Sequence, residues 1–281
     1  MKQTILPPNP FYTFQTKVIN RSALLKWLRS RWMYPSLTRL VRGEKICFLN
    51  YGYAALDGAG QVLDLEPADE PNRFCIQLYR RMAVAIELRG CDILEVSCGH
   101  GGGAEYIARA LGPATYTGVD LNPEAIRFCR ETHQHEGLTF AHGSAESLAF
   151  ADARFDAVLN VEASHCYGSM ERFLGEAARV LRPGGHFLFA DIRRRDEVAR
   201  LERQLAASGL KTVETEDITP NVVRAIELDD ARKKALVERL SPLGLRGFFS
   251  GFARLKETPG YHALASGEEV YLRYALRKVD R

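Results

Sequence analysis

The stretch from Asp92 to Asp120 constrains the fold of this chain more than any other. A short apolar run leads into a glycine-rich loop, then into apolar residues at helical spacing, and then into a second apolar run that ends in an acid. This pattern predicts a β-α-β unit. The loop contains Gly99, Gly101, Gly102 and Gly103. Such a loop turns sharply into a helix, where free N–H groups attract electronegative atoms of a ligand.

Two nucleoside cofactors compete for this unit. Asp120 ends the second strand, where a carboxylate can accept both hydroxyls of a ribose. Gly99-x-Gly101-x-x-Ala104 fits the dinucleotide pattern, so NAD is one alternative. Glu95 at the end of the first strand favours S-adenosylmethionine, because a carboxylate repels a pyrophosphate and attracts an ammonium and a sulfonium.

The rest of the chain continues to alternate between strand and helix patterns, as a doubly wound α/β sheet requires. Asn122 and Pro123 predict the start of a helix after the second strand. Further strands are expected at 138–141, 155–161, 186–191, 211–218 and 270–276, and helices at 74–88 and 171–181. A tight turn is expected at 182–185 and a long helical insertion at 219–252. We expect four regions: a basic helical arm with a lid segment (1–73), a cofactor-binding core (74–218), a helical lid insertion (219–267) and a final strand (268–281).

Length and composition set ordinary bounds. A chain of 281 residues can bury one full α/β core with an attached cap. The sequence has no apolar run of membrane-spanning length and no signal peptide, so we expect a cytoplasmic protein. Six scattered cysteines predict free thiols. Convergence of Cys98, His100, His165 and Cys166 on a metal is an alternative, but small residues lining a cofactor pocket explain them better, so no metal is expected.

The first 45 residues form a separate electrostatic unit. They contain nine lysines or arginines against Glu44 alone, although the whole chain has a net charge of only +3. Apolar residues fall near one helical face, which predicts a basic amphipathic helix. Peripheral contact with an anionic membrane, capping of the substrate pocket, nucleic-acid binding and simple packing remain alternatives. We expect a small-molecule or lipid acceptor rather than nucleic acid, and the oligomeric state stays open.

Four segments resemble a known family: E-V-S-C-G-H-G-G-G, Y-T-G-V-D-L-N-P, N-V-E-A-S-H-C-Y and V-L-R-P-G-G-H-F. Together they resemble the class I S-adenosylmethionine-dependent methyltransferases, and in particular the phthiotriol/phenolphthiotriol dimycocerosate methyltransferases. The resemblance implies a Rossmann-like, mostly parallel seven-stranded sheet. It also implies methyl transfer to a hydroxyl of a lipid or polyketide-like molecule, with S-adenosylhomocysteine as the product.

The resemblance also assigns cofactor roles. Glu95 and Gly99 would hold the methionine end, Asp120 the ribose, and Ala145 the adenine through its backbone. Ser97 stands where the family usually has its first motif glycine, and Ser144 stands where it usually has Asp. The remaining expected cofactor residues are Gly101, Leu121, Glu146 and Asn160.

The catalytic pair is expected where two neighbouring strands end. The strand that ends at Val161 precedes His165, and the next strand ends at Asp191. An Asp bound to one imidazole nitrogen fixes the tautomer and leaves the other nitrogen to take a proton from the acceptor. Glu162 lies at the same sheet edge, where it would contact the acceptor or replace His165 as the base.

Four aromatic residues are candidates for acceptor binding. Tyr51 and Tyr53 lie on a loop before the core, and Phe248 and Phe249 lie in the helical insertion beside Phe252. Plain core packing is the alternative for all of them. The sequence therefore favours an O-methyltransferase. An NAD-dependent oxidoreductase and a non-methylating, cofactor-bound scaffold or rearrangement catalyst are the alternatives.

Overall fold

The computed structural model describes residue 35 and residues 38–39, 42–44, 46–56, 63–242 and 244–279. Nearly all of the predicted basic amphipathic helix therefore lies outside the described residues. A single 3-10 turn, η3 (Arg42–Glu44), belongs to the end of that arm.

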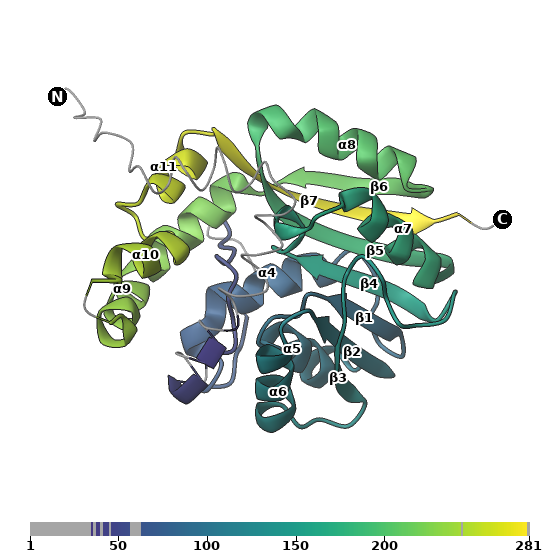
Figure 1. The fold of residues 1–281 in the computed structure, drawn as a ribbon, viewed down its shortest axis with the longest axis horizontal. Coiled ribbons are helices and arrows are strands. Elements are labelled where there is room, and N and C mark those ends of the chain that lie inside the picture. Colours follow the sequence, from purple (N-terminus) through teal and green to yellow (C-terminus); the bar gives the residue numbers. More distant parts are fainter. Residues whose placement is uncertain are drawn as a thin grey trace.

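The described chain folds around one seven-stranded sheet (Figure 1). The order of the strands is β3-β2-β1-β4-β5-β7-β6, and β7 alone runs antiparallel to its neighbours. The strands are β1 (Asp92–Val96), β2 (Thr115–Asp120), β3 (Leu138–His142), β4 (Phe155–Val161), β5 (Leu181–Arg194), β6 (Leu210–Asp217) and β7 (Glu269–Lys278). The predicted doubly wound, mostly parallel sheet is confirmed.

Helices cover both faces of the sheet. They are α4 (Arg73–Ala83), α5 (Gly102–Leu111), α6 (Pro123–Thr132), α7 (Met170–Val180) and α8 (Val198–Ala207), with 3-10 turns η4 (Glu70–Asn72), η5 (Ser164–Cys166) and η6 (Arg195–Glu197). Asn122 caps α6 by accepting from the N–H of Glu124, as its position before Pro123 predicts. The predicted helix 74–88 ends earlier, at Ala83.

The connection between α7 and β5 differs from the sequence prediction. The expected tight turn at 182–185 lies within β5 as an irregular start of the strand. Phe155 pairs with Leu181 while Ala157 pairs with His186, so the register shifts across these residues. Gly184, with φ of 77°, provides the left-handed residue that this irregularity needs.

Side chains alternate between two apolar clusters on opposite faces of the sheet. In β1, Ile93 joins the cluster formed with α4, α5 and α6, whereas Leu94 joins the one formed with α7 and α8. Full burial of each large apolar side chain contributes about 1.5–3 kcal/mol. Alternate side chains of β1 therefore point toward α4, α5 and α6, and the others point toward α7 and α8.

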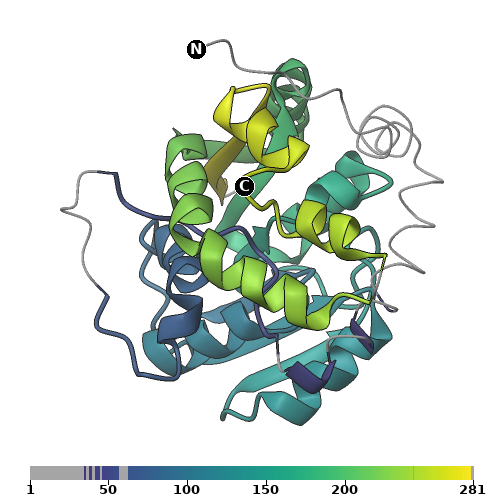
Figure 2. The ribbon, with the colours of Figure 1, turned by 90° about the vertical axis from the view of Figure 1, so that its left-hand side faces the viewer.

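A separate layer of helices fills the chain between β6 and β7. It consists of α9 (Thr219–Leu240), α10 (Arg246–Phe252) and α11 (Pro259–Ala265). These helices lie beyond one end of the sheet, at the left of Figure 1 and toward the viewer in Figure 2. Val237, Phe249 and Leu255 form a small core of their own inside this layer.

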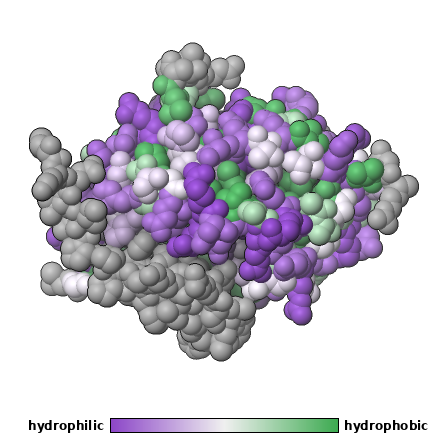
Figure 3. Space-filling model, turned by 90° about the horizontal axis from the view of Figure 1, so that it is seen from above, coloured by the Kyte–Doolittle hydropathy of each residue, from purple (hydrophilic) through white to green (hydrophobic). Residues whose placement is uncertain are grey.

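Where described residues form the face seen from above, Figure 3 shows hydrophilic side chains interleaved with hydrophobic patches. No helix in the described part of the chain is long and apolar enough to cross a membrane.

Candidate active site

Two cavities open at the edge of the sheet where the parallel strands end. The glycine-loop cavity has a volume of about 790 Å³ and is lined by residues around the loop after β1, the end of β2 and the segment after β4. The helical-layer cavity has a volume of about 570 Å³ and is lined by the end of β5 and by α8 to α11.

The two cavities meet at a junction. The residues that line both of them are Tyr51, His165, Tyr167, Gly168 and Phe252. A ligand in either cavity would therefore lie against this set of residues.

Asp120 holds the glycine loop in place. Its Oδ2 accepts from the N–H of Gly99 at 2.9 Å, and its Oδ1 accepts from the N–H of Asn122 at 2.8 Å. Burial raises the pKa of Asp120 to about 6. Ser97 adopts a positive φ of 62°, which explains why the family usually has glycine there, and its hydroxyl lies 2.6 Å from the hydroxyl of Tyr167.

The segment after β3 forms another wall of the glycine-loop cavity, together with Leu121. Ser144 Oγ accepts from the N–H of Glu146 at 3.2 Å, and Ala145 lies between them. Glu146 Oε1 accepts from the N–H groups of Gly168 and Ser169 at 2.8 and 3.1 Å. Glu146 thus fixes a loop of the junction as well as lining the cavity.

Glu95 does not line either cavity. Its position in β1 puts it on the same face as Ile93, and its carboxylate accepts from the hydroxyls of Tyr79 at 2.7 Å and Tyr116 at 2.9 Å. The residue is 1% exposed, and burial raises its pKa to about 7. Of Glu95, Tyr79 and Tyr116, only Tyr79 lines the glycine-loop cavity.

Gly101 and Asn160 also stand behind the cavity wall. A Cβ on Gly101 would lie 2.9 Å from Cys129 Sγ, so glycine is needed here for the packing of α5 against α6. Asn160 is fully buried and donates to the backbone oxygen of Val96 at 2.8 Å and to the hydroxyl of Tyr167 at 2.7 Å. It thereby supports a residue of the junction.

His165 and Asp191 form the pair that the strand order predicts. The Nδ1 of His165 lies 2.7 Å from Oδ1 of Asp191, which is completely buried. Asp191 Oδ2 also accepts from the Ser164 hydroxyl at 2.6 Å and from the backbone N–H of His165 at 2.9 Å. The carboxylate is therefore held rigidly, and it fixes the orientation of the imidazole.

Charges around this pair shift both pKa values. Burial alone would raise the pKa of Asp191, but Arg193, whose Nη1 lies 2.9 Å from Oδ2, and His165 hold it well below its usual range. Burial alone would lower the pKa of His165, but Cys166 and the Asp191 carboxylate outweigh this effect and raise it. The imidazole is consequently cationic at neutral pH unless another positive charge lies close to it.

Glu162 follows the last residue of β4 and lines the glycine-loop cavity. Its Oε2 accepts from the N–H of Tyr51 and from the hydroxyl of Tyr271, each at 3.0 Å. Burial raises the pKa of Glu162 to about 7.

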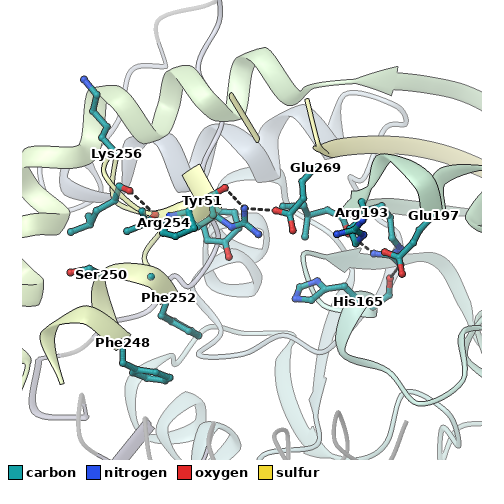
Figure 4. Close-up of a pocket in the computed structure, with 18 of the residues that line it drawn as sticks. Tyr51, His165, Arg193, Glu197, Phe248, Ser250, Phe252, Arg254, Lys256 and Glu269 are labelled. Carbon is teal, nitrogen blue, oxygen red and sulfur yellow. Dashed lines mark hydrogen bonds and ion pairs between the residues drawn. The ribbon is translucent and has the colours of Figure 1, made fainter. Parts of the chain in front are cut away.

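The ring of Tyr51 packs against a buried ion pair. The Arg254 guanidinium carbon lies 5.0 Å from the centre of the Tyr51 ring, and Arg254 Nη1 lies 2.6 Å from Glu269 Oε2. Burial raises the pKa of Tyr51 to about 12. Figure 4 shows the rings of Tyr51, His165 and Phe252 around a common space, with the Arg254 guanidinium directed at Glu269.

The other candidates for acceptor contact are separated by the structure. Phe248 lines the helical-layer cavity. Phe249 instead is buried in the small core of that layer, against which Phe248 also packs, and it lines neither cavity. Tyr53 lines neither cavity and packs against the core cluster beside α4.

The residues considered for a metal, Cys98, His100, His165 and Cys166, all line the glycine-loop cavity. His100 uses both ring nitrogens, with Nε2 2.9 Å from the Thr38 hydroxyl and Nδ1 2.7 Å from the backbone oxygen of Ile46. His165 is bound to Asp191. Within the described residues, no group of three or more His, Cys, Asp or Glu side chains is arranged to hold a metal ion. All six cysteines are free, as predicted.

Sequence reasoning missed three residues of the site. Ser164 and Tyr167 lie in the segment N-V-E-A-S-H-C-Y, so their nearness to His165 was the available signal. Arg254 had no local signal, because the end of α10 brings it to Tyr51 only in the folded chain.

Comparisons with known proteins show the family to which this chain belongs. A methyltransferase domain family matches residues 94–189. A phthiotriol/phenolphthiotriol dimycocerosates methyltransferase of Mycobacterium tuberculosis is 44% identical over 248 residues, which cover 88% of this chain and 91% of that protein. A fatty-acid O-methyltransferase of Mycolicibacterium smegmatis is 42% identical over 246 residues, which cover 88% of each.

Two solved structures share the fold. The cyclase SpnF has a TM-score of 0.67 at 21% identity and covers 89% of this chain and 94% of its own. The geranyl diphosphate C-methyltransferase from Streptomyces coelicolor, solved with Mg²⁺, geranyl diphosphate and S-adenosyl-L-homocysteine, has a TM-score of 0.60 at 17% identity, covering 88% and 98%. From the sheet order, the glycine loop and these relatives together, the chain belongs to the class I S-adenosylmethionine-dependent methyltransferases and is similar to the phthiotriol/phenolphthiotriol dimycocerosates methyltransferases.

Proposed function

We propose that this methyltransferase transfers a methyl group from S-adenosylmethionine to a hydroxyl oxygen of a lipid or polyketide-like small molecule. The observation that carries the proposal is that the paired His165 lines both cavities at their junction. A general base is useful only where the electrophile and the nucleophile meet, and the junction is such a place.

The glycine-loop cavity fits the cofactor. Its lining combines the backbone of Gly99, the carboxylate of Asp120 and the segment of Ser144 to Glu146 with the apolar side chain of Leu121. Ser97 and Ala145 complete the contacts that we propose for the cofactor. Gly101, Glu95 and Asn160 would act on it indirectly, through the start of α5, Tyr79 and Tyr167.

The reaction follows from what the two cavities bring together. S-adenosylmethionine, when bound, supplies a methyl group on a positively charged sulfur. Tyr51 and Phe252 restrict the path of the acceptor through the junction, and well-aligned reactants gain about 7–11 kcal/mol from orientation alone. His165 accepts the proton of the acceptor hydroxyl, and Asp191 stabilises the resulting imidazolium.

The charge on His165 fits this role once the cofactor is considered. In the unliganded protein Asp191 favours the imidazolium. The imidazole loses its proton more easily when a cation occupies the adjoining cavity, because like charges disfavour the charged form of a base. Binding of the positively charged cofactor would therefore prepare the base, and we expect no metal to be needed.

The helical-layer cavity supports an acceptor with an apolar part. Phe248, Phe252 and Leu255 line it, together with many charged side chains such as Arg193, Glu197 and Lys234. The apolar side chains would hold an apolar part of the acceptor, and the charged ones would bind its polar groups. The named activities of the two curated relatives, on dimycocerosates and on fatty acids, also support a lipid-like acceptor.

The decisive experiment is transfer of label from methyl-labelled S-adenosylmethionine to a panel of long-chain alcohols, hydroxylated polyketides, fatty acids and phenols. We expect labelled methyl ethers from alcohols. If labelled methyl esters are the products and no labelled ethers form, the acceptor group is a carboxylate and not a hydroxyl. Conversion of an acceptor without label would support a rearrangement catalyst, and tight NAD binding without any response to S-adenosylhomocysteine would exclude methyl transfer.

We further propose peripheral membrane contact through the basic arm, on the strength of its sequence alone. Flotation of the full chain with anionic vesicles is expected to weaken with added salt and to be lost when the arm is deleted. Equal flotation of both proteins would leave only packing or pocket capping as the role of the arm.

A further inference from the structure

Three residues with an unusual backbone gather around the two cavities. Four non-glycine residues of the described chain have a positive φ, and Ser97, Glu162 and Arg254 among them line the cavities. Such conformations cost about 1–3 kcal/mol each and persist where the surroundings enforce them, commonly at functional sites. Of these three, Glu162 carries a carboxylate that the chemistry of methyl transfer does not require.

The two carboxylate oxygens of Glu162 have different surroundings. Oε2 accepts from the Tyr51 N–H and the Tyr271 hydroxyl. Oε1 accepts no hydrogen bond from the described residues. It is also absent from the buried polar atoms that lack a partner among them, so this oxygen keeps some exposure. Since Glu162 lines the glycine-loop cavity, Oε1 is the oxygen open to that cavity.

The carboxylate of Glu162 lies close to His165. An acceptor hydroxyl must pass the junction to reach a methyl group held in the glycine-loop cavity, and His165 lines that passage. Glu162 precedes η5, which contains His165, and its carboxylate acts electrostatically on the imidazole. The reacting end of the acceptor therefore meets two proton acceptors, His165 and Glu162.

A simple alcohol has one O–H group and can satisfy only one of them. If the O–H group of a simple alcohol donates to His165, the alcohol displaces water from Glu162 Oε1. The hydrogen bond that the water donated to Oε1 is then lost and not replaced. Leaving a carboxylate oxygen desolvated and unpaired is costly. An acceptor with a second O–H group beside the first would satisfy both.

We infer that the preferred acceptor is a diol, in which one hydroxyl is methylated at His165 while its neighbour donates a hydrogen bond to Oε1 of Glu162. In the transfer the sulfur–methyl bond breaks, the oxygen–methyl bond forms, and the proton of the methylated hydroxyl passes to His165. The second hydroxyl keeps its proton. This inference rests on the proposed O-methylation and adds the class of acceptor.

The first test uses the wild-type full chain with three acceptors of one chain length. They are a secondary alcohol, the corresponding vicinal diol, and the diol whose second hydroxyl is already a methyl ether. We expect kcat/KM for the diol to exceed that of the other two by about ten- to a hundred-fold, the worth of a hydrogen bond to a charged group. The blocked diol controls for size and polarity.

The second test replaces the carboxylate. Glu162→Gln keeps an oxygen for Tyr51 and Tyr271 but presents an uncharged group to the cavity, so the preference for the diol should fall to less than about threefold. Glu257→Gln is the matched control, because Glu257 is an exposed carboxylate of the helical-layer cavity. It should keep the wild-type preference. Thermal unfolding of both variants checks that each is folded.

The outcomes separate this inference from the proposed function. If the wild type methylates all three acceptors at equal kcat/KM, the inferred preference for a diol is wrong and the proposed O-methylation stands. No methylation of any alcohol would overturn O-methylation itself. A Glu162→Gln variant that keeps its diol preference but binds S-adenosylhomocysteine more weakly would assign Glu162 to the cofactor instead, and would also overturn the inference.

Discussion

Nδ1 of His165 lies 2.7 Å from Oδ1 of Asp191, a carboxylate that is completely buried and also bound to Ser164. A contact this short to a carboxylate fixes Nδ1 as the protonated nitrogen and assigns proton exchange with the acceptor to Nε2. His165 lies in η5, just after β4, and Asp191 lies within the neighbouring parallel strand β5, one residue beyond the last pair that β5 makes with β4.

Replacement of His165 by Ala should lower turnover by about a hundred- to ten-thousand-fold, the usual contribution of a general base. Affinity for S-adenosylhomocysteine should change little, because the proposed cofactor contacts are made by other residues of the glycine-loop cavity. Steady-state kinetics and calorimetric titration measure the two effects. His262→Ala, at an exposed position on α11 that lines neither cavity, is the control. Near-normal turnover of His165→Ala would show that the base lies elsewhere.

Replacement of Asp191 by Asn should move the alkaline rise of the pH–rate profile to lower pH. The carboxylate raises the pKa of His165, and only the neutral imidazole accepts a proton, so wild-type turnover increases as pH rises through that pKa. Removing a neighbouring opposite charge lowers the pKa by about one to three units. The plateau should fall less than in His165→Ala. If the midpoint of the alkaline rise does not change, Asp191 does not control the pKa of His165. Asp152→Asn, which removes an exposed carboxylate, is the control variant.

Replacement of Asp120 by Ala should weaken binding of S-adenosylhomocysteine by about 1.5–3 kcal/mol, as expected for loss of a charged hydrogen-bond acceptor. The Gly99 and Asn122 N–H groups lose their partner in the same variant. Calorimetry gives the affinity, and unfolding without ligand gives the separate effect on the loop. Unaltered affinity would mean that the ribose is not bound at the end of β2.

Replacement of Glu95 by Gln should stabilise the protein at alkaline pH relative to the wild type. The folded-state pKa of Glu95 is about 7, above its ordinary value of 4.5, so the folded protein binds more protons than the unfolded chain between these values. Wild-type stability therefore falls as pH rises through this window, by about 3 kcal/mol from this group. Gln has no such titration.

The measurement for Glu95 is the difference in unfolding free energy between variant and wild type at about pH 5 and about pH 8. It should increase with pH by that amount. Raised carboxyl groups that do not act on Glu95, such as Glu162, titrate in both proteins and cancel. A difference that is flat with pH would mean that Glu95 is ionised in the folded protein throughout.

The sequence alone determined the order of the elements and the nearness of His165 to Asp191. Strand and helix periodicities are local, and the alternation of β and α patterns leaves few topologies for a parallel sheet. Because parallel strands end at the same edge, residues that follow neighbouring strands meet there whatever the details of packing.

The tertiary structure alone decided which side chains reach the cavities. Glu95 was expected at the cofactor, but the alternation of β1 turns it toward α4, where the hydroxyls of Tyr79 and Tyr116 satisfy its carboxylate. Phe248 and Phe249 differ by one position on α10, and only Phe248 faces the cavity. Arg254 reaches Tyr51 through the packing of segments that lie far apart in the chain. A side chain's surroundings depend on which distant element covers its face, and no local pattern in the sequence contains that information.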